Sequence, residues 1–318
     1  MSVADALQLR VRQLRWESDN VVSLVLEHPA GESLPEWAPG AHIDVHLGSG
    51  LIRQYSLCGD PTDKTRYRVA VLKEEAGHGG SRYVHERLRP GDLLPTAGPR
   101  NNFDLIDSPE YVFLAGGIGI TPILAMVAEA ERRGARWELH YGGRSLDSMS
   151  FLGELAGYGD RVHLVPQDAE GILDLPSIMG TARPDTLVYA CGPEPLLAAV
   201  EEAGAAWPSG CIQLERFKSV PREAGESSSD TEFRVVAERS EIAVTVAPGV
   251  SIMDALEGVG IDVPNSCRDG ICGSCETRVL CGQPDHRDSI LSADEQETGE
   301  TMMLCVSRAL SDELVLDI

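Results

Sequence analysis

Hydrophobic and polar positions alternate with a period of two in the first hundred residues. Residues 43–47 have the sequence Ile-Asp-Val-His-Leu, and residues 67–71 have the sequence Tyr-Arg-Val-Ala-Val. This spacing places apolar side chains on one face of a β-strand. It predicts an antiparallel sheet or a small β-barrel in this part of the chain.

From residue 111 onward, apolar strands alternate with helical segments. The strand at residues 111–115 is followed by a glycine-rich turn and by a helix that we expect to begin at Pro122 and end near Gly134. Three further strands are predicted at residues 137–141, 161–165 and 186–191. Strands that alternate with helices indicate a parallel sheet covered on both faces, so this part is predicted to have an α/β fold.

A polar segment at residues 218–231 contains three consecutive serines and has the composition of a linker. Beyond it, residues 242–246 alternate again, and Ser251 with Asp254 three residues later is typical of a helix start. The predicted organisation is an antiparallel β domain at 1–108, an α/β domain at 109–217, a linker at 218–231 and a third domain at 232–318.

The composition is that of a globular protein with a strong acidic excess. The 318 residues include 50 acidic and 27 basic side chains, for a formal charge of −23. Such a charge repels nucleic acid and anionic membrane surfaces, so neither is an expected partner. No apolar run approaches the ~20 residues of a membrane span, and residues 1–12 lack the apolar region of a signal peptide. We expect a soluble, cytoplasmic monomer.

Four of the eight cysteines have a spacing that indicates a metal centre. Four residues separate Cys267 from Cys272, two separate Cys272 from Cys275, and 29 separate Cys275 from Cys305. The first two intervals match those of plant-type [2Fe–2S] clusters. We therefore predict that these four cysteines bind iron.

Two alternatives concern the same segment. A structural zinc site is less consistent with the spacing, because such sites usually have two pairs of closely spaced ligands. Cys281 competes for the fourth position, but it follows Cys275 by only six residues and would crowd the loop, so we interpret it as a bystander. The small residues Gly270, Gly273 and Ser274 allow backbone N–H groups to approach the sulfur atoms.

The C-terminal motifs resemble a known family. The loop at 267–275, the string Pro-Asp-His-Arg-Asp-Ser at 284–289 and the string Leu-Cys-Val-Ser-Arg-Ala at 304–309 are similar to the ferredoxin domain of the phthalate dioxygenase reductase family. The resemblance extends over nearly the whole chain. It implies a six-stranded FMN-binding barrel, a nucleotide-binding α/β domain and a β-grasp [2Fe–2S] domain. Electrons would pass from NADH through FMN and the cluster to a terminal oxygenase protein.

Two strings in the first domain have the chemistry of a flavin site. Residues 53–57, Arg-Gln-Tyr-Ser-Leu, offer a guanidinium for a phosphate, an aromatic ring and a hydroxyl, although a half-exposed strand has similar residues. The glycine-rich residues 77–81 form either an anion-binding nest or a plain surface turn. The resemblance implies FMN rather than FAD. It also implies the following contacts: Arg53, Gln54, Tyr55, Ser56, Val71, Lys73, Gly79, Gly80 and Ser81.

The string Gly-Gly-Ile-Gly-Ile-Thr-Pro at 116–122 follows a strand and opens a helix, a context suited to a pyrophosphate. Together with Tyr-Ala-Cys-Gly-Pro at 189–193 it resembles the nicotinamide domain of the ferredoxin reductase superfamily. The resemblance implies a nucleotide site formed by Gly117, Gly119, Thr121, Pro122, Cys191, Gly192 and Pro193.

The resemblance also implies three residues beside the nicotinamide and flavin rings. Cys191 would lie near C4 of the nicotinamide, Ser56 would lie on the flavin side, and Phe217 would cover the flavin. Without the resemblance, Cys191 is a buried core thiol and Phe217 is simple core packing.

Two alternative functions use the same motifs. The relay could serve a cytochrome P450 or another acceptor in place of a Rieske-type oxygenase. An iron–sulfur sensor is the alternative from another class, but a sensor does not need the flavin and nucleotide strings.

Overall fold

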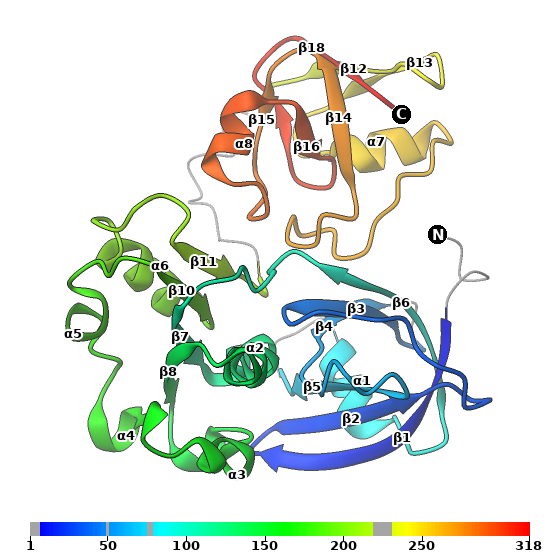
Figure 1. Ribbon diagram of the computed structural model, residues 1–318. Coiled ribbons are helices and arrows are strands. Elements are labelled where there is room, and N and C mark those ends of the chain that lie inside the picture. The colour runs from blue at the N-terminus through cyan, green and yellow to red at the C-terminus, as the bar shows by residue number, and fades with distance from the viewer. Residues whose placement is uncertain (1–6, 49–50, 75–78, 219–230) are drawn as a thin grey trace. The chain divides into compact units, whose positions relative to one another are not determined.

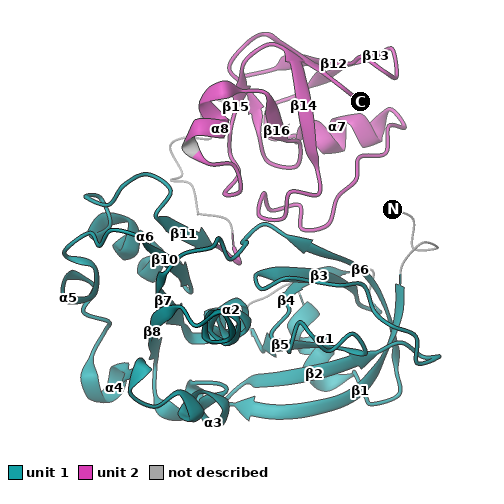
Figure 2. Ribbon diagram, in the orientation of Figure 1, with its two compact units in different colours: residues 1–215 teal, residues 216–318 magenta. Residues whose placement is uncertain are grey.

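The computed structural model describes residues 7–48, 51–74, 79–218 and 231–318. The chain divides into two compact units, Met1–Glu215 and Arg216–Ile318, which Figure 2 shows in different colours. The first unit contains two sheets, so the boundary that we predict at residue 108 lies within it. Most of the predicted linker, residues 219–230, lies outside the described residues.

The first sheet of unit 1 is a closed antiparallel barrel. Its strands have the order β4-β3-β6-β1-β2-β5, and every neighbouring pair is antiparallel. A bridge between Leu57, just after β4, and Val69 of β5 joins the two outer strands. The strands are β1 (Leu7–Ser18), β2 (Val21–Glu27), β3 (Ala41–His46), β4 (Ile52–Ser56), β5 (Arg66–Leu72) and β6 (Leu93–Asn101), and the helix α1 (Gly80–Glu86) lies between β5 and β6.

The barrel confirms the prediction from the period-two pattern. The alternating segments at 43–47 and 67–71 lie largely within β3 and β5. Ile43, Val45, Tyr67, Val69 and Val71 are all buried in the same core cluster. Burial of these side chains from two strands in one core is the main stabilising contribution to this half of the unit.

The second sheet of unit 1 is fully parallel, with the strand order β11-β10-β7-β8-β9. Its strands are β7 (Glu110–Gly116), β8 (Arg136–Gly143), β9 (Val162–Pro166), β10 (Thr186–Cys191) and β11 (Ile212–Glu215). The helices are α2 (Ile120–Arg133), α3 (Leu152–Leu155), α4 (Gln167–Glu170), α5 (Leu175–Met179) and α6 (Glu194–Ala203), as Figure 1 shows.

Helices cover both faces of this sheet, as the sequence predicts. Phe113 of β7 packs in the cluster that contains the buried face of α2, whereas Val112 and Leu114 pack with residues of α5 and α6. The helix α2 begins at Ile120, two residues before the predicted start, and is capped by Gly134 with a φ of 69°. The strand β9 lies one residue further along the chain than predicted, and β10 has the predicted bounds.

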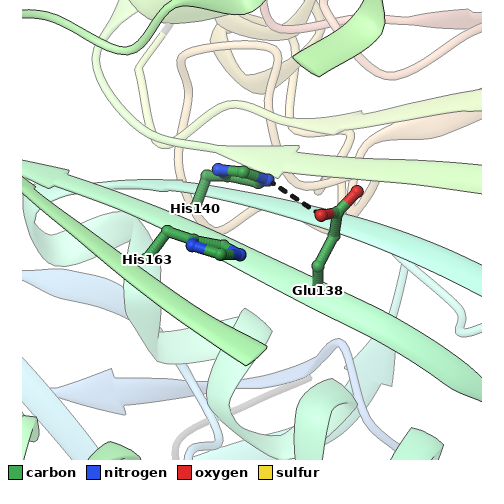
Figure 3. A group of neighbouring side chains, drawn as sticks. All are labelled: Glu138, His140 and His163. Carbon is green, nitrogen blue, oxygen red and sulfur yellow. Dashed lines mark ion pairs between the residues drawn. The ribbon is translucent and has the colours of Figure 1, made fainter. Parts of the chain in front are cut away.

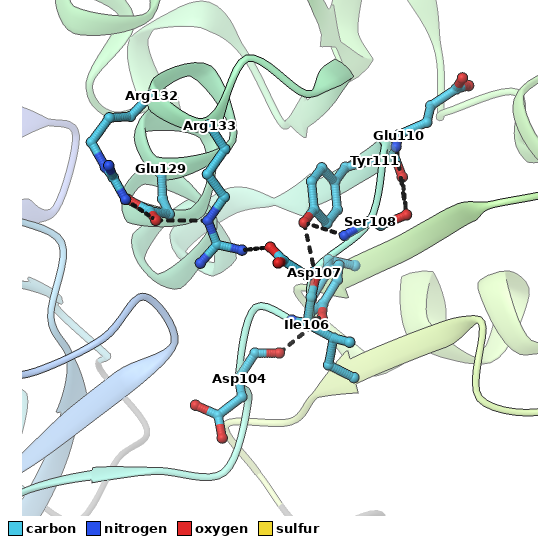
Figure 4. Close-up of polar contacts among 10 residues, drawn as sticks. Asp104, Ile106, Asp107, Ser108, Glu110, Tyr111, Glu129, Arg132 and Arg133 are labelled. Carbon is cyan, nitrogen blue, oxygen red and sulfur yellow. Dashed lines mark hydrogen bonds and ion pairs between the residues drawn. The ribbon is translucent and has the colours of Figure 1, made fainter.

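A short connection between the barrel and the parallel sheet is held by hydrogen bonds, as Figure 4 shows. The Tyr111 hydroxyl accepts a hydrogen bond from the N–H of Ser108 at 2.9 Å and donates one to the carbonyl of Ile106 at 2.8 Å. Asp107 forms an ion pair of 2.6 Å with Arg133 at the end of α2. The connection is therefore fixed to the sheet that follows it, in agreement with the single compact unit.

Unit 2 is an α+β domain with a mixed five-stranded sheet of order β13-β12-β18-β14-β16. β12 and β18 are parallel, and the other pairs are antiparallel. Its elements are β12 (Phe233–Ala237), β13 (Ile242–Val246), α7 (Ile252–Gly258), β14 (Glu276–Cys281), β15 (Pro284–Asp285), α8 (Ala293–Thr298), β16 (Thr301–Met303), β17 (Arg308–Ala309) and β18 (Glu313–Leu316). Ser251 caps α7 by accepting a hydrogen bond from the N–H of Asp254, which confirms the predicted helix start.

Across the described ranges of both units, no helix combines the length and the apolar character that a membrane crossing requires.

Candidate functional site

Arg53 and the start of α1 lie against each other in the barrel. A Cβ atom on Gly80 would lie 2.8 Å from Cγ and 2.9 Å from Nε of Arg53, so a larger residue at position 80 would require the Arg53 side chain to move. Gly79, which precedes the helix, has a φ of 89°. The structure thus brings together two strings that are separate in the sequence. A guanidinium beside a helix N-terminus is suited to bind a phosphate.

The remaining residues of the glycine-rich string are less informative. The Ser81 hydroxyl accepts a hydrogen bond of 3.0 Å from the N–H of Glu74. Residues 77 and 78 lie outside the described residues.

A polar network supports β4 from the neighbouring strands. The amide Nε2 of Gln54 donates a hydrogen bond of 3.1 Å to Oδ1 of Asp44, and Nη2 of Arg100 donates one of 2.7 Å to the same oxygen. Ser56 is buried at the end of the strand, and burial raises the pKa of Tyr55 far above its ordinary value, so its hydroxyl stays protonated. The buried Asp44 is a supporting residue that the sequence did not single out.

Two further predicted flavin contacts have partners within the barrel. Val71 is buried, and its carbonyl oxygen lies 2.9 Å from Nε2 of His85. The Lys73 ammonium forms an ion pair of 3.0 Å with Glu86 at the end of α1. Lys73 is therefore not a free cation in this structure.

The two nucleotide strings meet at the carboxyl ends of β7 and β10. After β7 the chain continues through β8 and β9 on one side, and β10 and β11 lie on the other, so a topological switch point falls between β7 and β10. A Cβ atom on Gly119 would lie 2.2 Å from the carbonyl oxygen of Cys191 and 2.7 Å from the N of Gly192. A Cβ on Gly116 would lie 2.7 Å from Cδ of Pro193. Parallel sheets bind ligands at such a point.

The other residues of the first string shape the turn into α2. Gly117 has a φ of 54° and opens the 3-10 turn Gly117–Gly119. Thr121 is buried, and its hydroxyl donates a hydrogen bond of 3.0 Å to the carbonyl of Ile118. Pro122 is buried in the first turn of α2. Thr121 and Pro122 therefore act on the shape of the backbone in this structure.

Glu215 is a candidate residue that sequence reasoning missed. It pairs in register with Cys191 across β10 and β11, and Cys191 Sγ lies 3.8 Å from its Oε2. Burial raises the pKa of Glu215 to about 8, although part of the side chain is exposed. Burial, together with this carboxyl group, raises the pKa of the Cys191 thiol well above its ordinary value. No local signal in the sequence marks this residue, because its environment depends on the pairing of β10 with β11.

Phe217 follows β11 by two residues and is 36% exposed. The structure does not bury it in a hydrophobic core. Its assignment to the flavin stays a prediction.

The four predicted iron ligands gather in unit 2. Cys272, Cys275 and Cys305 are buried and Cys267 is partly buried, whereas Cys281 ends β14 and is exposed. Three of the four predicted ligands come from one loop, and Cys305 follows β16.

The sulfur atoms of this group interact with each other and with backbone N–H groups. The thiols of Cys272 and Cys305 and the backbone N–H groups of Ile271 and Asp269 lower the pKa of Cys267, and the same contacts between sulfur atoms raise the pKa of Cys272 and Cys305. The N–H of Asp269 lies 3.3 Å from Cys267 Sγ. Sulfur atoms that lie within hydrogen-bonding reach of each other and of backbone donors match the environment of an iron–sulfur cluster.

Comparison with known proteins agrees with this geometry. Residues 235–310 match the family described as a 2Fe-2S iron-sulfur cluster binding domain. Over 315 residues, the chain is 42% identical to phenoxybenzoate dioxygenase subunit beta of Ectopseudomonas oleovorans, covering 98% of this chain and 97% of that protein. The solved structure of phthalate dioxygenase reductase matches with a TM-score of 0.74 and 34% identity, covering 99% of this chain and 98% of that one.

The chain belongs to the phthalate dioxygenase reductase family. It is therefore an oxidoreductase, and its fold is the modular one of that family. This reductase also matches part of an intact type IV self-sufficient cytochrome P450 monooxygenase with a TM-score of 0.93 and 43% identity. That match covers 99% of the reductase and 41% of the P450 chain.

Proposed function

We propose that this reductase carries electrons from NADH to a terminal oxygenase of the Rieske type that acts on an aromatic or related small substrate. The observation that carries the proposal is the meeting of Gly119 with Cys191 at the switch point, in the same compact unit as the Arg53–Gly80 corner. A cluster-binding domain follows in the same chain. FMN and the [2Fe–2S] cluster, when bound, convert the two electrons of a hydride into single-electron transfers.

The barrel residues hold and orient the flavin in this proposal. Arg53 and the N–H groups at the start of α1 bind the phosphate. The strand residues Gln54, Tyr55 and Ser56 would contact the ring system, with Gln54 oriented by its hydrogen bond to Asp44. Ser56 is buried and Tyr55 is partly buried, so both would help to exclude water from the reacting atoms.

The switch-point residues hold the nucleotide. Gly117, Gly119 and the start of α2 bind the pyrophosphate, and Cys191, Gly192 and Pro193 contact the nicotinamide. Cys191 is neutral because burial raises its pKa, so it orients the ring by contact and not as a thiolate. Glu215 beside it keeps its proton near neutral pH, so this corner stays uncharged.

The nature of the acceptor is proposed from the relatives. The reductase matches a protein named as a subunit of phenoxybenzoate dioxygenase over 97% of that protein's length. The P450 match covers 41% of that chain. A terminal oxygenase is therefore the first candidate for the acceptor, and a P450 stays the second candidate. We further propose that the reductase works as a monomer in the cytoplasm.

Substitution of single cysteines tests the electron path and its terminal acceptor. Cys305→Ser is expected to lose iron and to abolish NADH-driven reduction of a purified Rieske-type oxygenase, while NADH oxidation by ferricyanide at the flavin continues. Cys281→Ser, the matched control, is expected to keep both iron and electron transfer. Loss of iron in Cys281→Ser with retention in Cys305→Ser would overturn the ligand assignment. Reduction of a P450 in place of the Rieske-type oxygenase would favour the second candidate.

A further inference from the structure

A second cluster of ligand-type side chains lies on the parallel sheet, away from the strand ends that hold the nucleotide strings. Glu138 and His140 alternate on β8 and therefore share a face of the sheet. His163 lies on the neighbouring edge strand β9, directly opposite His140 in the parallel register. Neither histidine belongs to any cofactor site described above.

The three side chains converge on one point. Oε2 of Glu138 lies 3.4 Å from Nε2 of His140, and the centroids of the two imidazole rings are 4.6 Å apart with an angle of 19° between the planes. One ligand atom from each of the three residues lies within 4.8 Å of the other two. Figure 3 shows both rings extending from their strands toward the side on which the Glu138 carboxylate lies.

The position of the His140 ring suits a cation. Nε2 of His140 is buried, and although Oε2 of Glu138 lies 3.4 Å away, the described residues form no hydrogen bond with this nitrogen. The site therefore offers a carboxylate oxygen and a buried imidazole nitrogen at short range.

A neighbouring cation orients the carboxylate. Nη2 of Arg183 lies 2.8 Å from Oε1 of Glu138, and its Nη1 lies 3.0 Å from Oε1 of Glu110. The guanidinium thus occupies one oxygen of Glu138 and leaves Oε2 directed at His140. Such outer partners fix the ligands of metal sites. The positive charge of Arg183 opposes a second cation nearby, so we expect moderate affinity.

We propose that Glu138, His140 and His163 form a binding site for a divalent transition metal such as Zn²⁺. Two imidazoles and one carboxylate are a zinc donor set that leaves a fourth position open for water. The exposure of His163 gives that position access to solvent. A bound ion would join the edge strand β9 to β8, so the metal would stabilise this side of the nucleotide-binding sheet.

The test is a zinc titration of the intact holoprotein, monitored by calorimetry and by X-ray absorption at the zinc edge. We expect one Zn²⁺ per chain with a shell of nitrogen and oxygen atoms at about 2.0–2.1 Å, and no loss of iron. His163→Gln should weaken zinc binding at least about tenfold, because it removes a ligand from an exposed position that folding does not need. His140→Gln should do the same.

His28 provides a matched control, because it lies 3.9 Å from Glu32 but has no third ligand in the described part of the chain. His28→Gln should leave the zinc affinity unchanged. A sulfur shell at about 2.3 Å would assign the zinc to exposed cysteines and overturn the proposal. Zinc affinity that is unchanged in both His140→Gln and His163→Gln would overturn it as well, as would the absence of binding at millimolar Zn²⁺.

Discussion

Replacement of Glu215 by Gln is expected to change how the stability of unit 1 depends on pH. Burial raises the pKa of this carboxyl group from its ordinary 4.5 to about 8, so the folded protein holds a proton that the unfolded chain releases. The folded state therefore binds more protons than the unfolded state between these two values, and the free energy of unfolding must fall as pH rises through this range. The amide in the Glu215→Gln variant does not titrate, so the substitution should remove this dependence.

The size of the effect follows from the pKa difference. Each pKa unit corresponds to about 1.4 kcal/mol, so a rise from 4.5 to about 8 sets an upper limit of roughly 5 kcal/mol. The Glu215 side chain is partly exposed, and solvent reduces the effect. We expect a loss of about 2–3 kcal/mol in wild type, with the stability present in full below pH 4.5, reduced progressively toward pH 8 and constant above it. In a unit of this size that loss is a decrease of roughly 4–12 °C in Tm.

Calorimetric unfolding at four pH values between 5 and 9, at constant ionic strength, measures this difference. The Tm of Glu215→Gln should approach that of wild type at pH 5 and exceed it increasingly toward pH 8. Glu202→Gln, which changes an exposed carboxyl group on α6, should show the same pH dependence as wild type. A constant difference in Tm between Glu215→Gln and wild type across the range would refute a proton held by this carboxyl group.

Three other changes test separate parts of the molecule. Arg53→Ala removes a charge-assisted contact worth roughly 1.5–3 kcal/mol, so it should weaken FMN binding about 10- to 150-fold in a fluorescence titration. Arg66→Ala, at an exposed position, should leave FMN binding unchanged. Equal FMN affinities of the two variants would place the phosphate elsewhere. Gly119→Ala places a Cβ 2.2 Å from the Cys191 carbonyl oxygen, so it should lower the free energy of unfolding by about 1–3 kcal/mol and weaken NADH binding. Gly153→Ala, with no atom within 4 Å of the new Cβ, should have neither effect. Normal NADH binding by Gly119→Ala would contradict the packing argument. Residues 232–318 hold 17 acidic and 6 basic side chains, and salt screens the attraction of these charges to a partner protein. In stopped-flow traces, electron transfer to the oxygenase should therefore slow steeply as the salt concentration rises, while flavin reduction by NADH changes little. A salt-independent reaction with the partner would exclude steering by these charges.

The fold was largely predictable because its periodicities are strong and local. Residues 111–115 are apolar throughout, as a strand buried on both faces must be, and all five are fully buried in β7. The end of α2 was marked by Gly134, whose left-handed conformation few other residues adopt. The start of the helix was placed two residues late, because Ile120 and Thr121 have no capping signal and the preceding 3-10 turn leads directly into the helix.

The short strands of unit 2 were harder to predict from the sequence. β15 and β17 contain two residues each, and β16 contains three. Such elements are too short for a periodic pattern, and their pairing depends on contacts between distant parts of the chain. Only the resemblance to a family predicted the β-grasp arrangement in advance.

Some residues of the candidate site have a local signal in the sequence, and others do not. Gly80 and Gly119 are visible in the sequence because each allows a close approach: Gly80 approaches the Arg53 side chain, and Gly119 approaches the Cys191 backbone. A glycine in a short string is a local signal of such an approach, so the strings could be found before the structure was known. Glu215 and Asp44 gain their environments only when separate strands come together: Glu215 by lying across from Cys191, and Asp44 by accepting hydrogen bonds from Gln54 and Arg100. A charged residue that is perturbed by tertiary burial leaves no local pattern in the sequence.

The same reasoning applies to the histidines of the sheet edge. His140 and His163 are 23 positions apart in the sequence, and only the parallel register of β8 and β9 places them opposite each other. A pair of this kind can form or disappear with a single substitution on the edge strand, because His163 is exposed and contributes little to the core. The nucleotide site depends instead on a backbone contact at Gly119, where a substitution displaces the chain itself. The proposed metal site can therefore be tested by His163→Gln without disturbing the electron path from nucleotide to flavin.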